Sequence, residues 1–144
     1  MSFRRLALAA LLAVAVPVGV YAQSAETTAP QLSLELNAVQ DVADACRLSF
    51  LVQNQTAGAI DEAVFETVIF DTSGGVVSLS LFDFRTLPTD RPRVRQFDLP
   101  GRACSTVGQV LINGANTCVV AGADSDVCDK ALSLGSRVSV ELIG

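Results

Sequence analysis

The sequence predicts an all-β domain, a two-sheet β-sandwich of Greek-key type with about seven strands. Apolar residues recur with period two in several segments, Gly and Pro separate these segments at regular spacing, and four cysteines lie among them. Strands of this kind bury their apolar faces by packing one sheet on another. The chain has 144 residues, of which 50% are hydrophobic and 17% charged, a composition typical of one globular domain.

The N-terminus has the pattern of a secretory signal peptide. Arg4 and Arg5 precede an apolar run that ends before Pro17, and small residues up to Ala22 suit a signal peptidase. The apolar run is shorter than the roughly 20 residues that span a bilayer, which favours cleavage over a membrane anchor. The Arg pair keeps the twin-arginine (Tat) export route open beside the general one.

The predicted organisation is a signal peptide over residues 1–22, a flexible N-terminal segment over 23–31 and a β-sandwich domain over 32–144. Two segments justify the first strands directly: Leu32, Leu34 and Leu36 alternate with polar residues, and Leu48 to Val52 repeats this alternation. The third and fourth strands are nearly continuous apolar runs on either side of a Gly-rich turn, which predicts a hairpin. The seven predicted strands are Leu32–Asn37, Arg47–Gln53, Phe65–Phe70, Val76–Phe82, Arg93–Leu99, Val107–Asn113 and Arg137–Ile143.

Only two segments could be helical. Ala38–Ala45 and Ser125–Leu132 could each hold a helical turn. Pro88, Pro92 and the Pro100-Gly101 pair mark the breaks around the fifth strand.

The four cysteines predict two disulfides in an oxidising compartment, since an even count follows a signal peptide and no zinc-type spacing is present. If successive strands reverse direction, Cys46 and Cys104 lie at one end of the domain, whereas Cys118 and Cys128 lie at the other. We therefore expect the pairs Cys46–Cys104 and Cys118–Cys128. Loop-closure entropy assigns them roughly 4 and roughly 3 kcal/mol of stabilisation.

Several function classes are excluded by composition. Without its first 22 residues the chain keeps eight basic and 15 acidic residues, a net charge of −7, and it has no His, Trp, Tyr or Met. Without His there is no Ser-His-Asp or Cys-His nucleophile pair and no imidazole metal ligand. The acidic balance argues against a nucleic-acid partner. We expect no cofactor, no metal and no membrane span in the mature chain.

A resemblance adds to this prediction. The strand from Leu48 to Asn54 and the hairpin from Phe65 to Gly75 resemble immunoglobulin-like sandwich modules of bacterial envelope proteins. The mature chain is also similar to a family of small exported proteins of alphaproteobacterial type, labelled only by a Tat pathway signal sequence. The resemblance implies an immunoglobulin-like fold and an envelope location, but no activity. The segments that carry the family similarity are Cys46–Phe50, Leu81–Phe84, Arg91–Pro100 and Val110–Gly114.

The main candidate site is a stripe of three arginines. Arg91, Arg93 and Arg95 fall on one face of an extended strand, where guanidinium groups could bind a partner's carboxylates or phosphates. The alternative is an edge strand whose arginines pair with carboxylates of the same chain, such as Asp83 or Glu66, and block edge-to-edge association.

Three further motifs have simpler interpretations. Asp71-Thr72-Ser73-Gly74 resembles the aspartic-protease loop, but the inserted Ser73 favours a hairpin turn. Asp124, Asp126 and Asp129 could collect a calcium ion, although the spacing of a calcium loop is absent. In Phe82-Asp83-Phe84 the aromatic rings should face the core and the carboxylate should face water.

The sequence thus predicts a non-enzymatic exported interaction or accessory module of the cell envelope, periplasmic or secreted, with an envelope protein as its partner. Two alternatives stay open. A pocket between the sheets would make it a small-ligand binder, and two converging carboxylates would make it a hydrolase.

Overall fold

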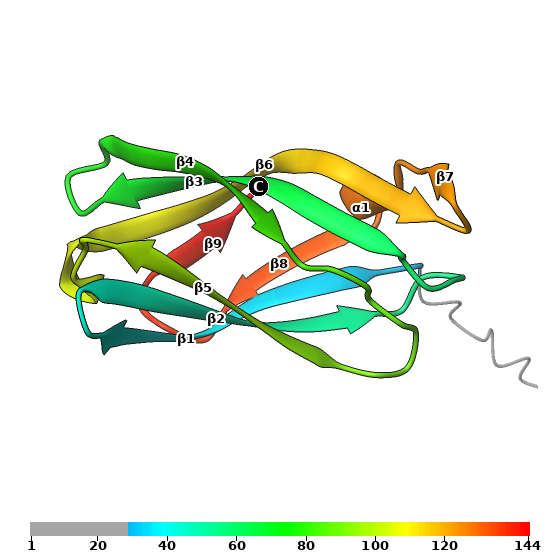
Figure 1. Cartoon of the computed structure of the whole chain (residues 1–144), viewed down its shortest axis with the longest axis horizontal. Helices are drawn as coiled ribbons and strands as arrows, with labels where there is room; N and C mark the ends of the chain where they lie inside the picture. The colour runs from blue at the N-terminus through cyan, green and yellow to red at the C-terminus, as the bar shows by residue number, and fades with distance from the viewer. Residues whose placement is uncertain (1–28) are drawn as a thin grey trace, which may run out of the picture.

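Two β-sheets packed face to face make up the computed structural model, which describes residues 29–144 (Figure 1). This confirms the predicted mostly-β sandwich. The predicted signal peptide, residues 1–22, and most of the predicted flexible segment lie outside the described residues. The four-stranded sheet has the spatial order β5 (Arg93–Pro100), β2 (Ala45–Asn54), β1 (Leu32–Val42) and β8 (Leu132–Ser136).

The second sheet has five strands, with β4 at one edge and β9 paired to β6 in parallel. One turn of 3-10 helix and one turn of α-helix complete the described chain, and the α-helical turn lies inside the segment predicted to hold one. These elements are β4 (Val76–Asp83), β3 (Glu62–Asp71), β6 (Val107–Val120), β7 (Ala123–Asp124), β9 (Glu141–Ile143), η1 (Cys104–Thr106) and α1 (Val127–Lys130).

The core fills the space between the sheets, as the period-two pattern predicts. Leu32, Leu34 and Leu36 of β1 are fully buried, while the residues between them are only half-buried. Five phenylalanines join the two sheets, and the rings of Phe82 and Phe97 stack with centroids 4.2 Å apart. Edge-to-face and tilted contacts link the rest of this aromatic cluster, Phe50, Phe65, Phe82, Phe84 and Phe97.

Both predicted disulfides are present. Cys46 and Cys104 are joined with their Cα atoms 4.8 Å apart, and Cys118 and Cys128 with theirs 6.0 Å apart. The argument from strand direction is therefore confirmed, because β5 runs antiparallel to β2 and brings the chain back to the end where Cys46 lies. Two disulfides indicate an oxidising, extracytoplasmic location.

Two segments differ from what the sequence indicates. The segment Ala38–Ala45 holds no helix: β1 continues through it to Val42, and the turn at Ala43 and Asp44 then leads into β2. The predicted strand Arg137–Ile143 is also displaced, because residues 132–136 form β8 and only Glu141–Ile143 of the predicted range is a strand.

None of the helices in the described part of the chain is long and apolar enough to cross a membrane.

Candidate functional site

The two sheet edges on one side of the sandwich are β4 and β5. We call this the open side. An open groove runs between the two strands, and its two parts enclose about 470 and about 640 Å³. The stacked rings of Phe82 and Phe97 lie in its wall, together with Leu81 and Gln96. The opposite edges, β8 and β9, are consecutive along the chain and lie against each other.

The predicted arginine stripe lies on the open side, and its members have different environments. Arg91 is exposed and precedes β5, while Arg93 and Arg95 are half-buried on the strand face that carries Phe97. Nε of Arg95 donates to the carbonyl oxygen of Phe84 at 2.6 Å. Its Nη2 donates to a second carbonyl of the same crossover at 3.0 Å. Arg95 therefore ties β5 to the chain that leaves β4.

The charges around Arg95 form a small positive cluster. Desolvation lowers the pKa of Arg95, and the nearby Arg93 and Arg85 lower it further, whereas Asp83 opposes them. In residues 29–144 no carboxylate lies within ion-pair distance of any stripe arginine, so the ion pairs expected in the alternative interpretation do not form. The cation that does form a bidentate pair with a carboxylate of β5 is Arg47, which meets Asp98 at 2.7 Å.

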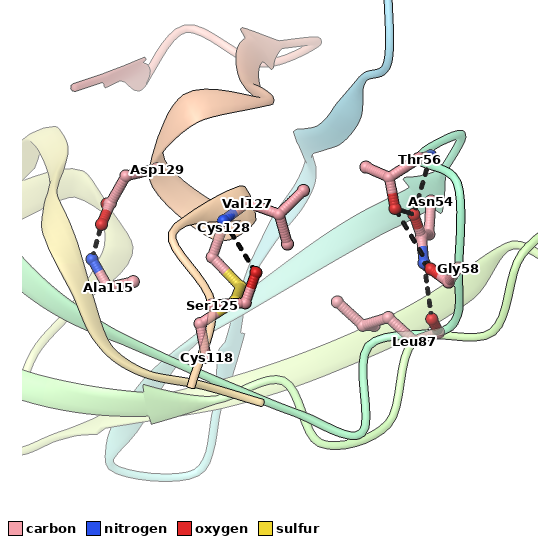
Figure 2. The surroundings of a disulfide bond; sticks show 10 residues. All are labelled: Asn54, Thr56, Gly58, Leu87, Ala115, Cys118, Ser125, Val127, Cys128 and Asp129. Atoms are coloured by element: carbon pink, nitrogen blue, oxygen red, sulfur yellow. Dashed lines mark hydrogen bonds between the residues drawn. A yellow bond between two sulfur atoms is a disulfide. The ribbon is translucent and has the colours of Figure 1, made fainter. Parts of the chain in front are cut away.

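The crossover from β4 to β5 is held by a buried amide, Asn54, which is not among the site residues predicted from the sequence. Asn54 is 3% exposed, and its Nδ2 donates to the carbonyl oxygens of Leu87 and Gly58 at 2.8 and 3.0 Å (Figure 2). Its Oδ1 accepts from the backbone N–H and the hydroxyl of Thr56. The crossover is therefore held by Asn54 on one strand and by Arg95, which also lines the groove, on another.

An apolar row crosses the outer face of the five-stranded sheet. Strand register places Leu79 of β4 beside Val68 of β3, then Leu111 of β6, then Ile143 of β9. Leu79 is 58% exposed and Leu81, two residues along β4, is 55% exposed. Val68 is only 7% exposed, so the exposed part of the row on this side is the pair Leu79 and Leu81. Exposed apolar side chains that lie together mark interaction surfaces more often than isolated ones do.

The two edges of the open side differ in chemistry. From Val76 to Phe82, β4 has no charged residue and no proline. By contrast β5 carries two arginines and an aspartate, and it begins after Pro92 and ends at Pro100. Charges and prolines are the usual means of keeping an edge strand from pairing with another chain. Residues 76–82 of β4 have neither, and we call β4 the unguarded edge for this reason.

The Asp71 motif is a turn. Oδ1 of Asp71 accepts from the hydroxyl and backbone N–H of Ser73 and from the N–H of Gly75. These bonds lower the pKa of Asp71, with the Ser73 hydroxyl as the largest cause. Gly74 has a φ of +87°, which the turn requires. The hairpin between β3 and β4 thus explains this motif.

The acidic residues around the second disulfide do not converge. Asp129 accepts from the backbone N–H of Ala115 at 2.8 Å (Figure 2), and Asp126 pairs with Lys130 at 2.6 Å. No group of three possible metal ligands occurs within residues 29–144. The order predicted for Phe82-Asp83-Phe84 is confirmed, since both rings are buried and the carboxylate between them is exposed.

No protein-family model, curated protein or solved structure matches the chain. The fold is thus established by the structure alone: residues 29–144 form a two-sheet β-sandwich of nine strands with two disulfides. The resemblance to immunoglobulin-like envelope modules and to the family of small exported proteins stays a prediction.

Proposed function

We propose that the protein is an exported, non-enzymatic interaction or accessory module of the cell envelope, periplasmic or secreted, and that it binds a partner protein through its open side. The observation that carries the proposal is the unguarded edge β4 with its exposed Leu79 and Leu81. Leu81 also lines the groove of the open side, where Arg95 is fixed by its hydrogen bonds to the crossover. A rigid apolar surface lowers the entropic cost of binding.

The carboxylates support a binding role over a hydrolytic one. A general acid needs a carboxyl whose pKa is raised toward neutrality. Here the pKa of Asp98 is lowered, first by its hydrogen bond with Arg47, and that of Asp126 is lowered by Lys130. Both groups are held as carboxylates by a cation, which suits structural pairing.

The interior of the sandwich gives no support to the small-ligand alternative. Phe50, Phe65 and Phe84 are 0% exposed and occupy the space between the sheets that a ligand would need. The hollow parts of the open side are grooves at the surface, and the polar side chain of Gln96 lines them beside Leu81 and Phe97. Such a surface suits a protein partner that adds its own apolar side chains.

The export part of the proposal rests on three supports. The disulfides need an oxidising compartment, the N-terminal sequence has the pattern of a signal peptide, and the family resemblance implies an envelope location. The export route can be determined in host strains that lack either the Tat or the general translocase. The strain that accumulates the full-length precursor identifies the route.

Site-specific photo-crosslinking tests the proposed surface. A photoreactive phenylalanine analogue replaces Leu81 in one variant and Asn116 in a second, both exposed on the five-stranded sheet but two strands apart. The protein is expressed in its native host and irradiated in intact cells. We expect a covalent protein adduct from position 81 and none from position 116.

The outcomes separate cleanly because both variants carry the same reactive group. An adduct confined to position 81 supports the open side as the binding surface. Adducts from position 116 alone, equal adducts from both positions, or no adduct from either position would each contradict the proposal.

A further inference from the structure

In β4, the backbone N–H and C=O groups of every second residue point toward the open side. The N–H of Phe84 donates to the carbonyl oxygen of Ala63, which sets the hydrogen-bonding phase of the antiparallel pair β3–β4. Because bonding residues alternate along such a pair, Ser80 and Phe82 also bond to β3. The N–H and C=O groups of Leu79 and the next outward residue, Leu81, therefore point away from β3, and β4 pairs with no other strand of the described chain.

The sequence of β4 is complementary to itself in one antiparallel register. With a two-fold axis at Ser80, Leu79 of one copy lies opposite Leu81 of the other, and Leu81 lies opposite Leu79. These are the residues whose backbone groups are open, so each pair can exchange both of its N–H···O bonds. Their side chains lie on the outer face, next to the apolar row that continues to Val68 and Leu111.

The charges of β4 also fit a second copy. Asp83 is its only charged residue, and it stands at the C-terminal end of the strand. In the register centred on Ser80 it lies opposite Val77, so the two Asp83 residues are six positions, or roughly 20 Å, apart along the strands. If β5 paired with β5 of a second copy in the same way, Arg93, Arg95 and two prolines would lie in the contact.

We propose that β4 binds β4 of a second copy of this chain, antiparallel about an axis at Ser80, and joins the two five-stranded sheets into one continuous sheet. This rests on the proposed function and names its partner. The two-fold contact is self-complementary and closes after two copies, which gives a dimer and not a fibre.

A disulfide trap tests the register. In the proposed dimer the two Ser80 residues form the non-hydrogen-bonded pair on the axis, where Cα atoms are about 4.5 Å apart, within the range of a disulfide. Ser78 lies on the same face with similar burial, but its two copies are four positions, or roughly 13 Å, apart. The variants Ser80→Cys and Ser78→Cys of the exported protein are therefore a matched pair.

We expect Ser80→Cys to form a disulfide-linked dimer under mild oxidation, and Ser78→Cys to stay monomeric on a non-reducing gel. Equal trapping of both variants, or trapping of neither, would overturn the proposed register. Because the added thiol could disturb the two native disulfides, the wild-type chain is measured in parallel by sedimentation velocity, where its mass should rise from monomer to dimer with concentration.

Leu81→Lys provides the disruptive variant. Leu81 pairs with Glu66 on β3, so the lysine gains an opposite charge within the monomer and the fold should be retained. In the dimer, two lysines next to the axis replace two apolar side chains. We expect the dissociation constant of the dimer to rise about tenfold or more. A wild-type chain that stays monomeric at every concentration would overturn the dimer.

Failure of this inference is distinguishable from failure of the proposed function. A monomeric wild type together with a position-81 photo-adduct of a different protein would reject the dimer and keep the binding surface. A monomeric wild type with no photo-adduct would reject both.

Discussion

Arg95 has a structural role that a stripe of three arginines does not reveal. Its guanidinium group donates hydrogen bonds to the carbonyl oxygens of Phe84 and Thr86. Those acceptors belong to an irregular crossover, and a backbone carbonyl leaves no trace in the identity of its residue. What the sequence does predict is that the neighbouring Arg91 and Arg93 lie on or before the same strand, and these two keep guanidinium groups that could meet a partner.

The difference between Arg95 and Arg93 gives a prediction for stability. Arg95→Met keeps the apolar length of the side chain but removes three charge-assisted hydrogen bonds, two to the crossover and one to the carbonyl of its neighbour Val94. We therefore expect a loss of about 1–3 kcal/mol in the free energy of unfolding. Arg93→Met is the matched control, since Arg93 donates only to the carbonyl of its neighbour Pro92, and its effect should stay within about 0.5 kcal/mol. Urea titration of both variants measures this, and equal losses would contradict the assignment.

Leu79 and Leu81, which belong to the proposed binding surface, are not among the site residues predicted from the sequence. Their alternation with serine places both on one face of β4, and this signal was available in the sequence. What was not available is the position of β4 at an edge, because strand order depends on contacts between distant segments. In a central strand, leucines that alternate with serine would be expected to face the core. In the edge strand β4 they are exposed on the outer face of the sheet.

At the scale of elements, the hairpin β3–β4 depends on a single carboxylate. Asp71 accepts three hydrogen bonds from the turn. These bonds are strongest while Asp71 is ionised, which is why its pKa is lowered from the ordinary value. The hairpin in turn sets where β4 begins, and so positions the unguarded edge.

The lowered pKa of Asp71 predicts a pH dependence. The folded chain binds a proton here less readily than the unfolded chain, so the contribution to stability is present above the ordinary carboxyl pKa of about 4 and is lost as the pH falls through the lower folded value. Asp71→Asn removes this titration. We expect its urea midpoint to fall less than that of the wild type between about pH 6 and about pH 3.

The control for this measurement is Asp44→Asn. Asp44 is exposed, and its side chain enters no ion pair or hydrogen bond with another described residue. An Asp71→Asn variant whose pH dependence equals that of the wild type and of this control would contradict the role given to Asp71. Asp98 and Asp126 keep part of the acid sensitivity in all three proteins, because their pKa values are lowered as well.

Strands in which apolar and polar residues alternate strictly could be predicted from the sequence, whereas strands with a weak alternation could not. The burial of Leu32, Leu34 and Leu36 follows directly from their spacing. Past Asn37 the pattern weakens at a β-bulge, and pairing with β2 keeps the chain extended in spite of its helix-forming alanines. The last two strands are only five and three residues long, too short for periodicity to place.

At the scale of the whole molecule, the covalent and polar ties leave one surface free. One disulfide connects the strand β2 with the turn η1, and the other connects β6 with α1. Asn54 and Arg95 hold the crossover between the sheets. The described chain is therefore tied at both ends, while the free backbone groups of β4 remain on the open side.

Amide hydrogen exchange at single-residue resolution tests the central claim most directly. In dilute protein the N–H groups of Leu79 and Leu81 should exchange fast while those of Ser80 and Phe82, bonded to β3, exchange slowly. At high concentration the two leucine amides should become protected as a second β4 covers them. Leucine amides protected even in dilute protein, or unprotected at every concentration, would contradict β4 as an open edge that binds a second copy.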